Sequence, residues 1–399
     1  MRIPFGTIAI TERSKSLIME ALNSNRVSSG RLVREFEKRF AQLVGAKEAV
    51  AVSTGTDADA LALAVLYDFG AERGDEIVVP ALSFVSTGNS VLQAGFTPVF
   101  VDIDRRTLNM DPDKIEERIS EKTKAIMPVH LMGKPANMDP IIETAKKCNL
   151  YVIGDAAEAH GAIYRGKNIG TIGDMAAYST YLAHIITTIE GGVVVTDRSD
   201  FAEILRSLRS HGRACKCESC VLNISSGYCP KRFQSGEGTD IRFQFERIGF
   251  SSKMNELEAA VGLGNLDMFD EIFKKKRKNL LAMIERFGKF GQYLYTIAEE
   301  PYEKIGPHAF PIILREGAPF TRNQLVDFME KNGIDTRSLF LSMPTQCPGF
   351  GFLNYQLGDF PNAEYIGNNG LHIGVHQDMG EEEIEYVMNT IAEFLEKHT

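Results

Sequence analysis

Short apolar runs alternate with stretches of helical periodicity through the first half of the chain. The runs are Glu48–Val52, Glu76–Pro80, Pro98–Val101, Ala125–Val129 and Tyr151–Gly154. Apolar strands that lack a polar face and are separated by helices are typical of a buried, mainly parallel sheet. The pattern therefore predicts an α/β fold.

The second half of the chain has a different pattern. A long helix is predicted over residues 256–297, and its basic run Lys274–Lys278 is interpreted as a solvated helix face. A strand at Phe310–Leu314, a helix at Gln324–Lys331 and a final helix from Glu381 follow. We therefore expect a large domain over residues 1–255 and a linking helix with a smaller α+β domain over residues 256–399.

Composition narrows the classes of function. The 399 residues are 44% hydrophobic and 24% charged, and the formal net charge is −9. An acidic chain of this kind argues against a general nucleic-acid or membrane-surface binder. It has no run of eighteen apolar residues, and its start lacks the apolar core of a signal peptide. A cytoplasmic enzyme is the expected class.

Two segments carry candidate chemistry at strand ends. Ser53-Thr54-Gly55-Thr56 lies between a strand and a helix, where backbone N–H groups can bind a phosphate, although an ordinary helix cap has the same pattern. Asp155 closes a predicted strand at the edge where open α/β sheets bind ligands. A carboxylate there can pair with a protonated pyridine nitrogen or serve as a turn aspartate.

Several motifs occur in a fixed order along the chain. They are Ser53–Thr56, Pro80–Phe84 (PALSF), Val129–Pro135 (VHLMGKP), Asp155–Gly161 (DAAEAHG) and Glu190–Gly192 (EGG). Together they resemble the DegT/DnrJ/StrS family of sugar-nucleotide aminotransferases from about residue 20 to the C-terminus. The resemblance implies a fold-type-I pyridoxal-phosphate (PLP) enzyme and a homodimer with active sites at the subunit interface.

The resemblance also implies roles for individual residues. Gly55, Thr56 and Ser179 would bind the cofactor phosphate, Phe84 would stack on its ring, and Asp155 would pair with the ring nitrogen. Two further positions depart from the family pattern. Glu158 stands where Gln is usual beside the ring hydroxyl, and Ser251 stands where an Asn usually reaches the partner subunit's cofactor phosphate.

His184 is the departure with the largest chemical consequence. The segment Tyr181–Gly192 resembles the family loop that carries the lysine that tethers PLP, with His184 in the lysine's place. It is most similar to the loop of the 3-dehydratases, which act on 4-keto-6-deoxyhexose nucleotides with pyridoxamine phosphate (PMP). An imidazole cannot hold a stable imine but can move protons. His184 is therefore expected to remove a proton from the cofactor and to assist departure of the C3 hydroxyl.

A cysteine cluster suggests a second site. Cys215, Cys217, Cys220 and Cys229 have the close spacing of metal ligands, which suits zinc or an iron–sulfur cluster. The surrounding segment, about residues 213–245, resembles the 2Fe–2S segment of CDP-4-keto-6-deoxyglucose 3-dehydrases. The subgroup's first cysteine aligns with Ala157 here, so we expect Cys220 to complete a 2Fe–2S site. That cluster would imply a separate flavin or iron–sulfur reductase.

Three functions remain open from the sequence. The favoured one is a PMP-dependent 3-dehydratase or deoxygenase of a nucleotide-linked 4-keto-6-deoxyhexose, with Arg337 as a candidate substrate ligand. The second is a dehydratase that regenerates PMP from glutamate and holds a structural zinc. The third is a catalytically silent family member that serves as a sensing or scaffold subunit.

Overall fold

The computed structural model describes residues 1–217, 220–221, 228–234 and 238–398. Its largest element is a seven-stranded sheet in the order β1-β9-β8-β5-β4-β2-β3. In chain order the strands are β1 (Glu48–Val52), β2 (Glu76–Pro80), β3 (Thr97–Val101), β4 (Thr123–Ile126), β5 (Tyr151–Asp155), β8 (Met175–Ser179) and β9 (Gly192–Thr196). Only β9 runs against its neighbours, and the other neighbouring pairs are parallel. The predicted α/β architecture is confirmed.

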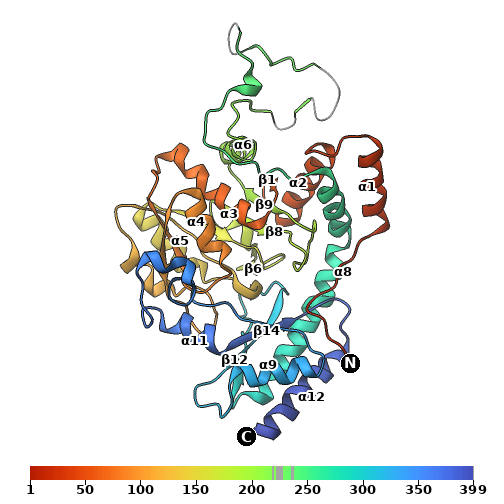
Figure 1. The fold of residues 1–399 in the computed structure, drawn as a ribbon, viewed down its shortest axis with the longest axis vertical. Helices are drawn as coiled ribbons and strands as arrows, with labels where there is room; N and C mark the ends of the chain where they lie inside the picture. The colour runs from red at the N-terminus through yellow and green to blue at the C-terminus, as the bar shows by residue number, and fades with distance from the viewer. Residues whose placement is uncertain (218–219, 222–227, 235–237, 399) are drawn as a thin grey trace.

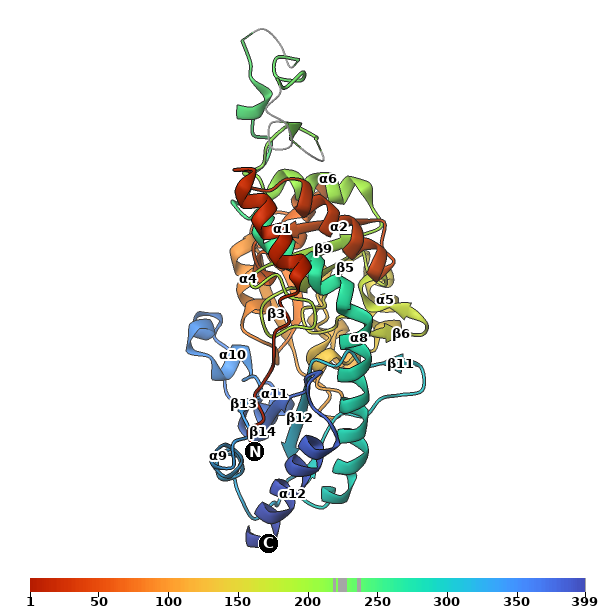
Figure 2. The same cartoon turned by 90° about the vertical axis from the view of Figure 1, so that its right-hand side faces the viewer.

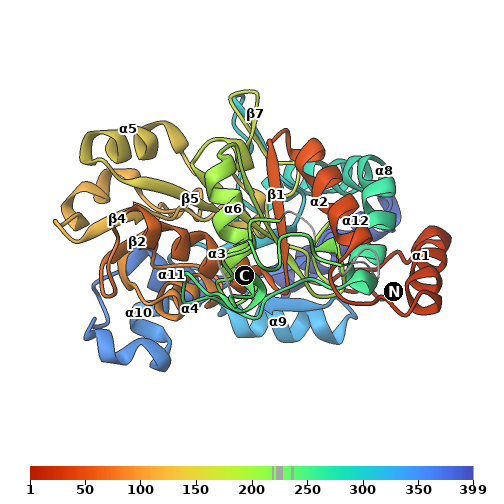
Figure 3. The same ribbon diagram turned by 90° about the horizontal axis from the view of Figure 1, so that it is seen from above.

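Successive side chains along each strand point to opposite faces of the sheet, so the buried core forms one cluster on each face. Val50 and Val52 belong to one buried cluster, and Ala49 and Ala51 to another. The first cluster contains α3 (Gly55–Ala64), α4 (Ser86–Ala94) and α6 (Ser199–Leu208). The second contains α2 (Arg31–Val44), α5 (Met138–Cys148) and the first half of α8 (Glu256–Phe287). Helices therefore cover both faces, with α5 and α8 at opposite ends in the view of Figure 3.

A smaller antiparallel sheet has the order β10-β12-β14-β13. Its strands are β10 (Leu294–Tyr295), β12 (Ala309–Leu314), β13 (Thr336–Ser338) and β14 (Gly370–Gly374). The helices around it are α9 (Arg322–Lys331), α10 (Met343–Gln346), α11 (Pro361–Asn369) and α12 (Glu381–His398). A third sheet of β11 (Glu303–Lys304), β6 (Ile163–Tyr164) and β7 (Lys167–Asn168) joins the two parts of the chain (Figure 1).

Helix α8 connects the large sheet to the small one and also contacts α1 (Glu12–Asn23) (Figure 2). It begins at a capping box in which Asn255 and Glu258 each accept from the other's backbone N–H. It ends at Phe287, not at residue 297, because Gly288 takes the C-cap and a short 3-10 turn follows. The boundary expected at residue 255 stays a prediction. No helix in the described ranges is long and apolar enough to span a membrane.

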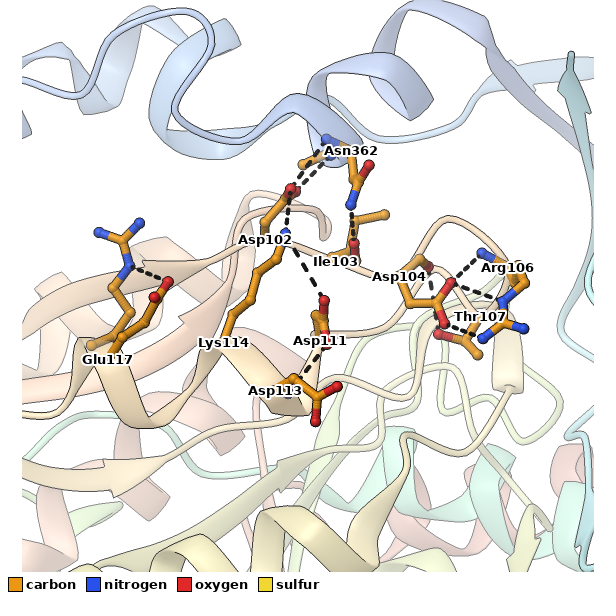
Figure 4. A network of polar contacts seen from close by, with 12 residues as sticks. Asp102, Ile103, Asp104, Arg106, Thr107, Asp111, Asp113, Lys114, Glu117 and Asn362 are labelled. Atoms are coloured by element: carbon orange, nitrogen blue, oxygen red, sulfur yellow. Dashed lines mark hydrogen bonds and ion pairs between the residues drawn. The ribbon is translucent and has the colours of Figure 1, made fainter. Parts of the chain in front are cut away.

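The two sheets are also joined at Asp102, directly after β3 (Figure 4). Its buried carboxylate accepts from the backbone N–H groups of Asn362 at 3.2 Å and Ala363 at 2.9 Å, and Lys114 lies 3.3 Å away. Because Asn362 and Ala363 form the first turn of α11, the carboxylate satisfies N–H groups that the helix leaves unpaired. Helix α11 leads straight into β14, so this contact fixes the strand that brings His372 to the site described below.

Candidate functional site

A cavity of about 620 Å³ lies at the carboxyl ends of the large sheet's strands and is completed by the small sheet. We call it the His184 cavity. It brings together nearly all of the predicted site residues, namely Gly55, Thr56, Phe84, Asp155, Glu158, Ser179, His184 and Arg337. Ser251 is exposed, pairs with Ser210 and does not line this cavity.

The N-terminus of α3 forms one end of the cavity. The Thr54 hydroxyl accepts from the N–H of Asp57 at 3.0 Å and so caps the helix. A Cβ on Gly55 would lie 2.6 Å from the Ser179 Cβ, so only glycine lets the helix approach the end of β8 this closely. The result is a helix N-terminus with a serine hydroxyl beside it, which is a suitable anion site.

Asp155 is the last residue of β5 and is almost fully buried. Its carboxylate accepts from the Thr87 hydroxyl at 2.7 Å and from the Ala157 N–H at 3.1 Å. Burial raises its pKa, while these two hydrogen bonds act in the opposite direction. A cationic partner in the cavity would therefore be strongly favoured beside this carboxylate.

Buried threonines close the loop that carries His184. The N–H of Thr188 donates to the Thr180 carbonyl at 2.9 Å, and the two hydroxyls lie 2.6 Å apart. The Thr187 hydroxyl also donates to the Thr180 carbonyl, at 3.1 Å. Gly191 has a φ of +156°, and a Cβ there would lie 2.3 Å from the Thr188 hydroxyl. The loop therefore holds His184 in a fixed place above the sheet.

His184 is a neutral imidazole in this environment. Burial, with smaller contributions from Lys276 and Arg337, lowers its pKa to about 3. An exposed imidazole titrates near neutrality, but the charged form of His184 is poorly solvated here. Its Nδ1 is buried and has no hydrogen-bond partner among the described residues. A neutral imidazole can accept a proton from a bound ligand.

Residues from the small sheet and its border complete the cavity. Among them Arg337 was predicted from the sequence, whereas His308 and His372 were not. His308 precedes β12, and His372 lies on β14 opposite Arg337 on β13. The Phe5 ring lies 3.7 Å from the Arg337 guanidinium carbon and 5.3 Å from the His372 ring, so the N-terminal segment supports this wall. No local pattern marks these histidines as site residues, because the packing of the small sheet brings both of them to the cavity from far along the chain.

A further residue absent from the predicted site is Asp59, on the α3 wall of the cavity. It is almost fully buried, and its Oδ1 has no hydrogen-bond partner among the described residues. Burial, and then the nearby Asp155, raise its pKa well above the usual range. Its neutral form is therefore favoured over the charged form beside Asp155.

The basic run on α8 also differs from the prediction. Arg277 forms a bidentate ion pair with Glu299, and the Lys276 side chain is buried. Burial lowers the pKa of Lys276 to about 8. This lysine does not line the His184 cavity. It faces the protein interior because α8 is covered on that side, so the run is not a uniformly solvated face.

The donor set of the His184 cavity fits a pyridoxal-type cofactor. An anion site, a buried carboxylate and the half-exposed Phe84 ring match the phosphate, ring nitrogen and ring face of such a molecule. No lysine is among the described residues that line the cavity. The site therefore suits a cofactor that is bound without a covalent tether.

The four cysteines line a separate cavity of about 390 Å³, which we call the cysteine cavity. Its other walls include Arg213, Lys231 and Arg242, from the segment that follows α6. Within the described ranges, no three side chains of the metal-binding types are arranged to hold a metal ion. The predicted 2Fe–2S geometry is therefore not formed by these residues as they lie in the structure.

Comparisons with known proteins identify the family of the chain. The model of the DegT/DnrJ/EryC1/StrS aminotransferase family matches residues 9–392. The chain belongs to this family. The predicted family and its aminotransferase fold, with a mostly parallel sheet, are thereby confirmed.

Relatives within the family differ in their reactions. The dTDP-4-dehydro-2,6-dideoxy-D-glucose 3-dehydratase of Saccharopolyspora spinosa is 35% identical, over 99% of this chain and 86% of the relative. The GDP-perosamine synthase of Caulobacter vibrioides is also 35% identical, over 99% and 98%. The structure of Escherichia coli GDP-4-keto-6-deoxy-D-mannose-3-dehydratase with bound hydrated PLP has a TM-score of 0.84 and 28% identity, and covers 98% of this chain and 99% of that one.

Proposed function

We propose that the chain is a 3-dehydratase that uses PMP to remove the C3 hydroxyl of a nucleotide-linked 4-keto-6-deoxyhexose. The observation that carries this proposal is a neutral imidazole, His184, in a family cofactor site that no described lysine lines. The dehydratases among its relatives support the same assignment. GDP-perosamine synthase is also a relative, but an amino-transfer reaction is disfavoured here because His184 cannot tether PLP.

The side chains of the cavity would divide the binding of cofactor and substrate. The α3 N-terminus with Ser179 binds the phosphate, Phe84 stacks on the ring, and Asp155 keeps the ring nitrogen protonated. Arg337, at the cavity wall, offers a cation to the substrate's diphosphate. When bound, PMP supplies an amine for the sugar ketone and a ring that withdraws electrons.

His184 supplies the proton-transfer step. The neutral imidazole of His184 would serve as the base of the reaction, and the bound cofactor would supply the acidic C–H group and the electron sink that allow the C3 hydroxyl to leave. The closed threonine loop holds the imidazole in place through this step. Because His184 offers no amine at this position, the loop would not compete with the sugar for the cofactor.

A homodimer is part of the proposal. Ser251 does not line the His184 cavity of its own chain, which suits a contact with the partner subunit's cofactor phosphate. The cytoplasmic location stays a prediction, as does the division of the chain into domains over residues 1–255 and 256–399.

The direct test is product analysis. The purified protein is incubated with PMP and a nucleotide-linked 4-keto-6-deoxyhexose, and the sugar is examined by mass spectrometry. Loss of the C3 oxygen is expected, whereas a 4-amino sugar that keeps this oxygen would overturn the proposal. Turnover sustained by glutamate alone would favour the dehydratase that regenerates PMP without a reductase. Absence of both PMP binding and turnover would favour a silent scaffold subunit.

The 2Fe–2S cluster is a further proposal that rests on cysteine spacing and on the shared cysteine cavity. The cysteines take no part in the steps described above. Protein purified without oxygen is expected to contain iron and sulfide in equal amounts, and replacing Cys217 and Cys220 with serine is expected to remove both. Stoichiometric zinc without iron would contradict the cluster and, with it, the need for a flavin or iron–sulfur reductase.

A further inference from the structure

Glu158 and His308 form a pair within the His184 cavity. The Glu158 Oε2 accepts from the Met132 N–H at 2.6 Å, and its Oε1 lies 3.5 Å from the His308 Nε2. Both side chains are largely buried, and both line the cavity. The His308 ring centre lies 5.1 Å from that of His184. An acid and two imidazoles therefore stand side by side around the space for the substrate.

The backbone around this pair is tightly constrained. Met132 adopts a left-handed conformation with a φ of +55°, which directs its N–H to Glu158. Gly133 follows with a φ of +79°, and its carbonyl accepts from the Gly306 N–H at 2.9 Å. A Cβ on Gly133 would lie only 1.9 Å from the Gly306 carbonyl oxygen. This close approach sets the segment before β12 against the large sheet and brings His308 to Glu158.

The protonation states of the pair are opposite to those of an ordinary ion pair. Burial raises the pKa of Glu158 to about 8, and burial together with His184 holds the pKa of His308 well below its usual range. At neutral pH the proton therefore resides on the carboxyl group, and His308 is a neutral imidazole. Its Nε2 faces the acid, while its Nδ1 has no hydrogen-bond partner among the described residues.

We propose that His308 is a second catalytic histidine, which relays a proton from Glu158 to the departing C3 hydroxyl. This inference rests on the proposed dehydration and changes the expectation that His184 performs both proton transfers. His184 then acts as the base alone. Glu158 supplies the acid. The family usually has Gln at this position, and an amide has no such proton to give.

The relay balances without any oxidant or reductant. His184 takes one proton from carbon, the C3–O bond breaks with its electron pair on oxygen, and a C3–C4 double bond forms. His308 gives its Nδ1 proton to that oxygen, so that water departs, and takes the Glu158 proton at Nε2. Glu158 is left as a carboxylate. Before the next turnover the Nε2 proton of His308 returns to Glu158, the His308 Nδ1 takes up a proton from solvent, and His184 releases the proton that it took from carbon.

Two variants test proton delivery by His308 and Glu158 separately from proton removal by His184. His308→Phe keeps a ring of similar size without nitrogens, and Glu158→Gln keeps an acceptor for the Met132 N–H. With PMP bound and substrate added in heavy water, exchange of the cofactor's C4′ hydrogens reports proton removal by His184. Release of water from C3 reports the relay. Both variants are expected to lose about 100-fold in C3–O cleavage, the usual contribution of a general acid, while exchange stays near the wild-type rate.

The pH profile gives a second readout. Because the relay needs protonated Glu158, C3–O cleavage is expected to fall as pH rises through about 8, and Glu158→Gln is expected to lose this dependence. The other titratable or charged groups around the pair are Asp155, His160, His184, Lys276, Arg337 and His372. Infrared spectra of the protein without substrate are expected to show protonated-carboxyl absorption at neutral pH, part of which is lost in Glu158→Gln and none of which is lost in the exposed control Glu117→Gln.

The outcomes distinguish this inference from the proposed function. Equal losses of exchange and of C3–O cleavage in His308→Phe would make His308 merely structural, and unchanged cleavage would make it dispensable. Either result overturns the relay and leaves the dehydratase assignment intact. A wild-type protein that neither exchanges nor cleaves would overturn the proposed function. Spectra in which Glu158→Gln removes no protonated-carboxyl absorption would overturn the relay without any turnover.

Discussion

Replacement of His184 with asparagine is expected to reduce C3–O cleavage by about 1,000-fold, within the range of general base catalysis. Asparagine has a similar size and polarity, so the threonine loop keeps its hydrogen bonds, but an amide cannot accept the proton. Because His184 does not tether the cofactor, PMP is expected to bind with nearly unchanged affinity. Stopped-flow measurement of cleavage, with PMP affinity from an absorbance titration, tests both statements.

The contrast between the two readouts makes this prediction specific. Loss of PMP binding together with activity would mean that His184 is a structural residue of the loop. Wild-type cleavage by the variant would mean that another group removes the proton. His184→Gln serves as a second variant, because it also lacks a basic nitrogen but has a longer side chain.

Replacement of Asp155 with asparagine is expected to weaken PMP binding by about 100-fold or more, since the loss of one partner from a buried charge pair costs about 3–5 kcal/mol. The amide oxygen can accept from the Ala157 N–H in place of Oδ1, and the amide NH2 can donate to the Thr87 hydroxyl in place of Oδ2, so the strand end keeps both contacts. C3–O cleavage is expected to fall as well, because an unpaired ring nitrogen withdraws electrons poorly. An absorbance titration of PMP, with the unfolding temperature as a control, measures the effect.

The pH dependence of binding provides the matching test for Asp155. Burial raises its pKa, so the carboxylate is protonated at a higher pH than an exposed aspartate. PMP affinity of the wild type is therefore expected to decline as pH falls, starting above the range of an ordinary aspartate. Asp155→Asn has no charge to lose there, and an equally steep decline in this variant would contradict the assigned ion pair.

The sequence predicts the large sheet well because its strands are continuous apolar runs. The residues at their carboxyl ends, such as Gly55 and Asp155, could be placed at one edge on the same ground. The position that holds the PLP-tethering lysine in other family members could be recognised from the motifs around His184. Local patterns were sufficient for these features because each one depends on neighbours in the chain.

Other features depend on contacts between distant segments. His308 and His372 reach the cavity only because the small sheet packs against the large one, with Asp102 and α11 at the join. The depressed pKa of His184 and the neutral state of Glu158 arise from burial. The hydrophobic periodicity of the sequence does not predict how deeply an individual polar side chain is buried. The burial of Lys276 within a basic run has the same origin.

The most direct test of the central claim is oxygen exchange at C3 in water enriched in heavy oxygen. This measurement reports C3–O cleavage whichever source supplies electrons or regenerates PMP. With PMP and a nucleotide-linked 4-keto-6-deoxyhexose, the wild type is expected to place solvent oxygen at C3 of recovered substrate or to release sugar without that oxygen. His184→Asn is expected to do neither. A wild type that keeps the original C3 oxygen throughout, or that returns a 4-amino sugar, would contradict the assignment of His184 as the base of a dehydratase.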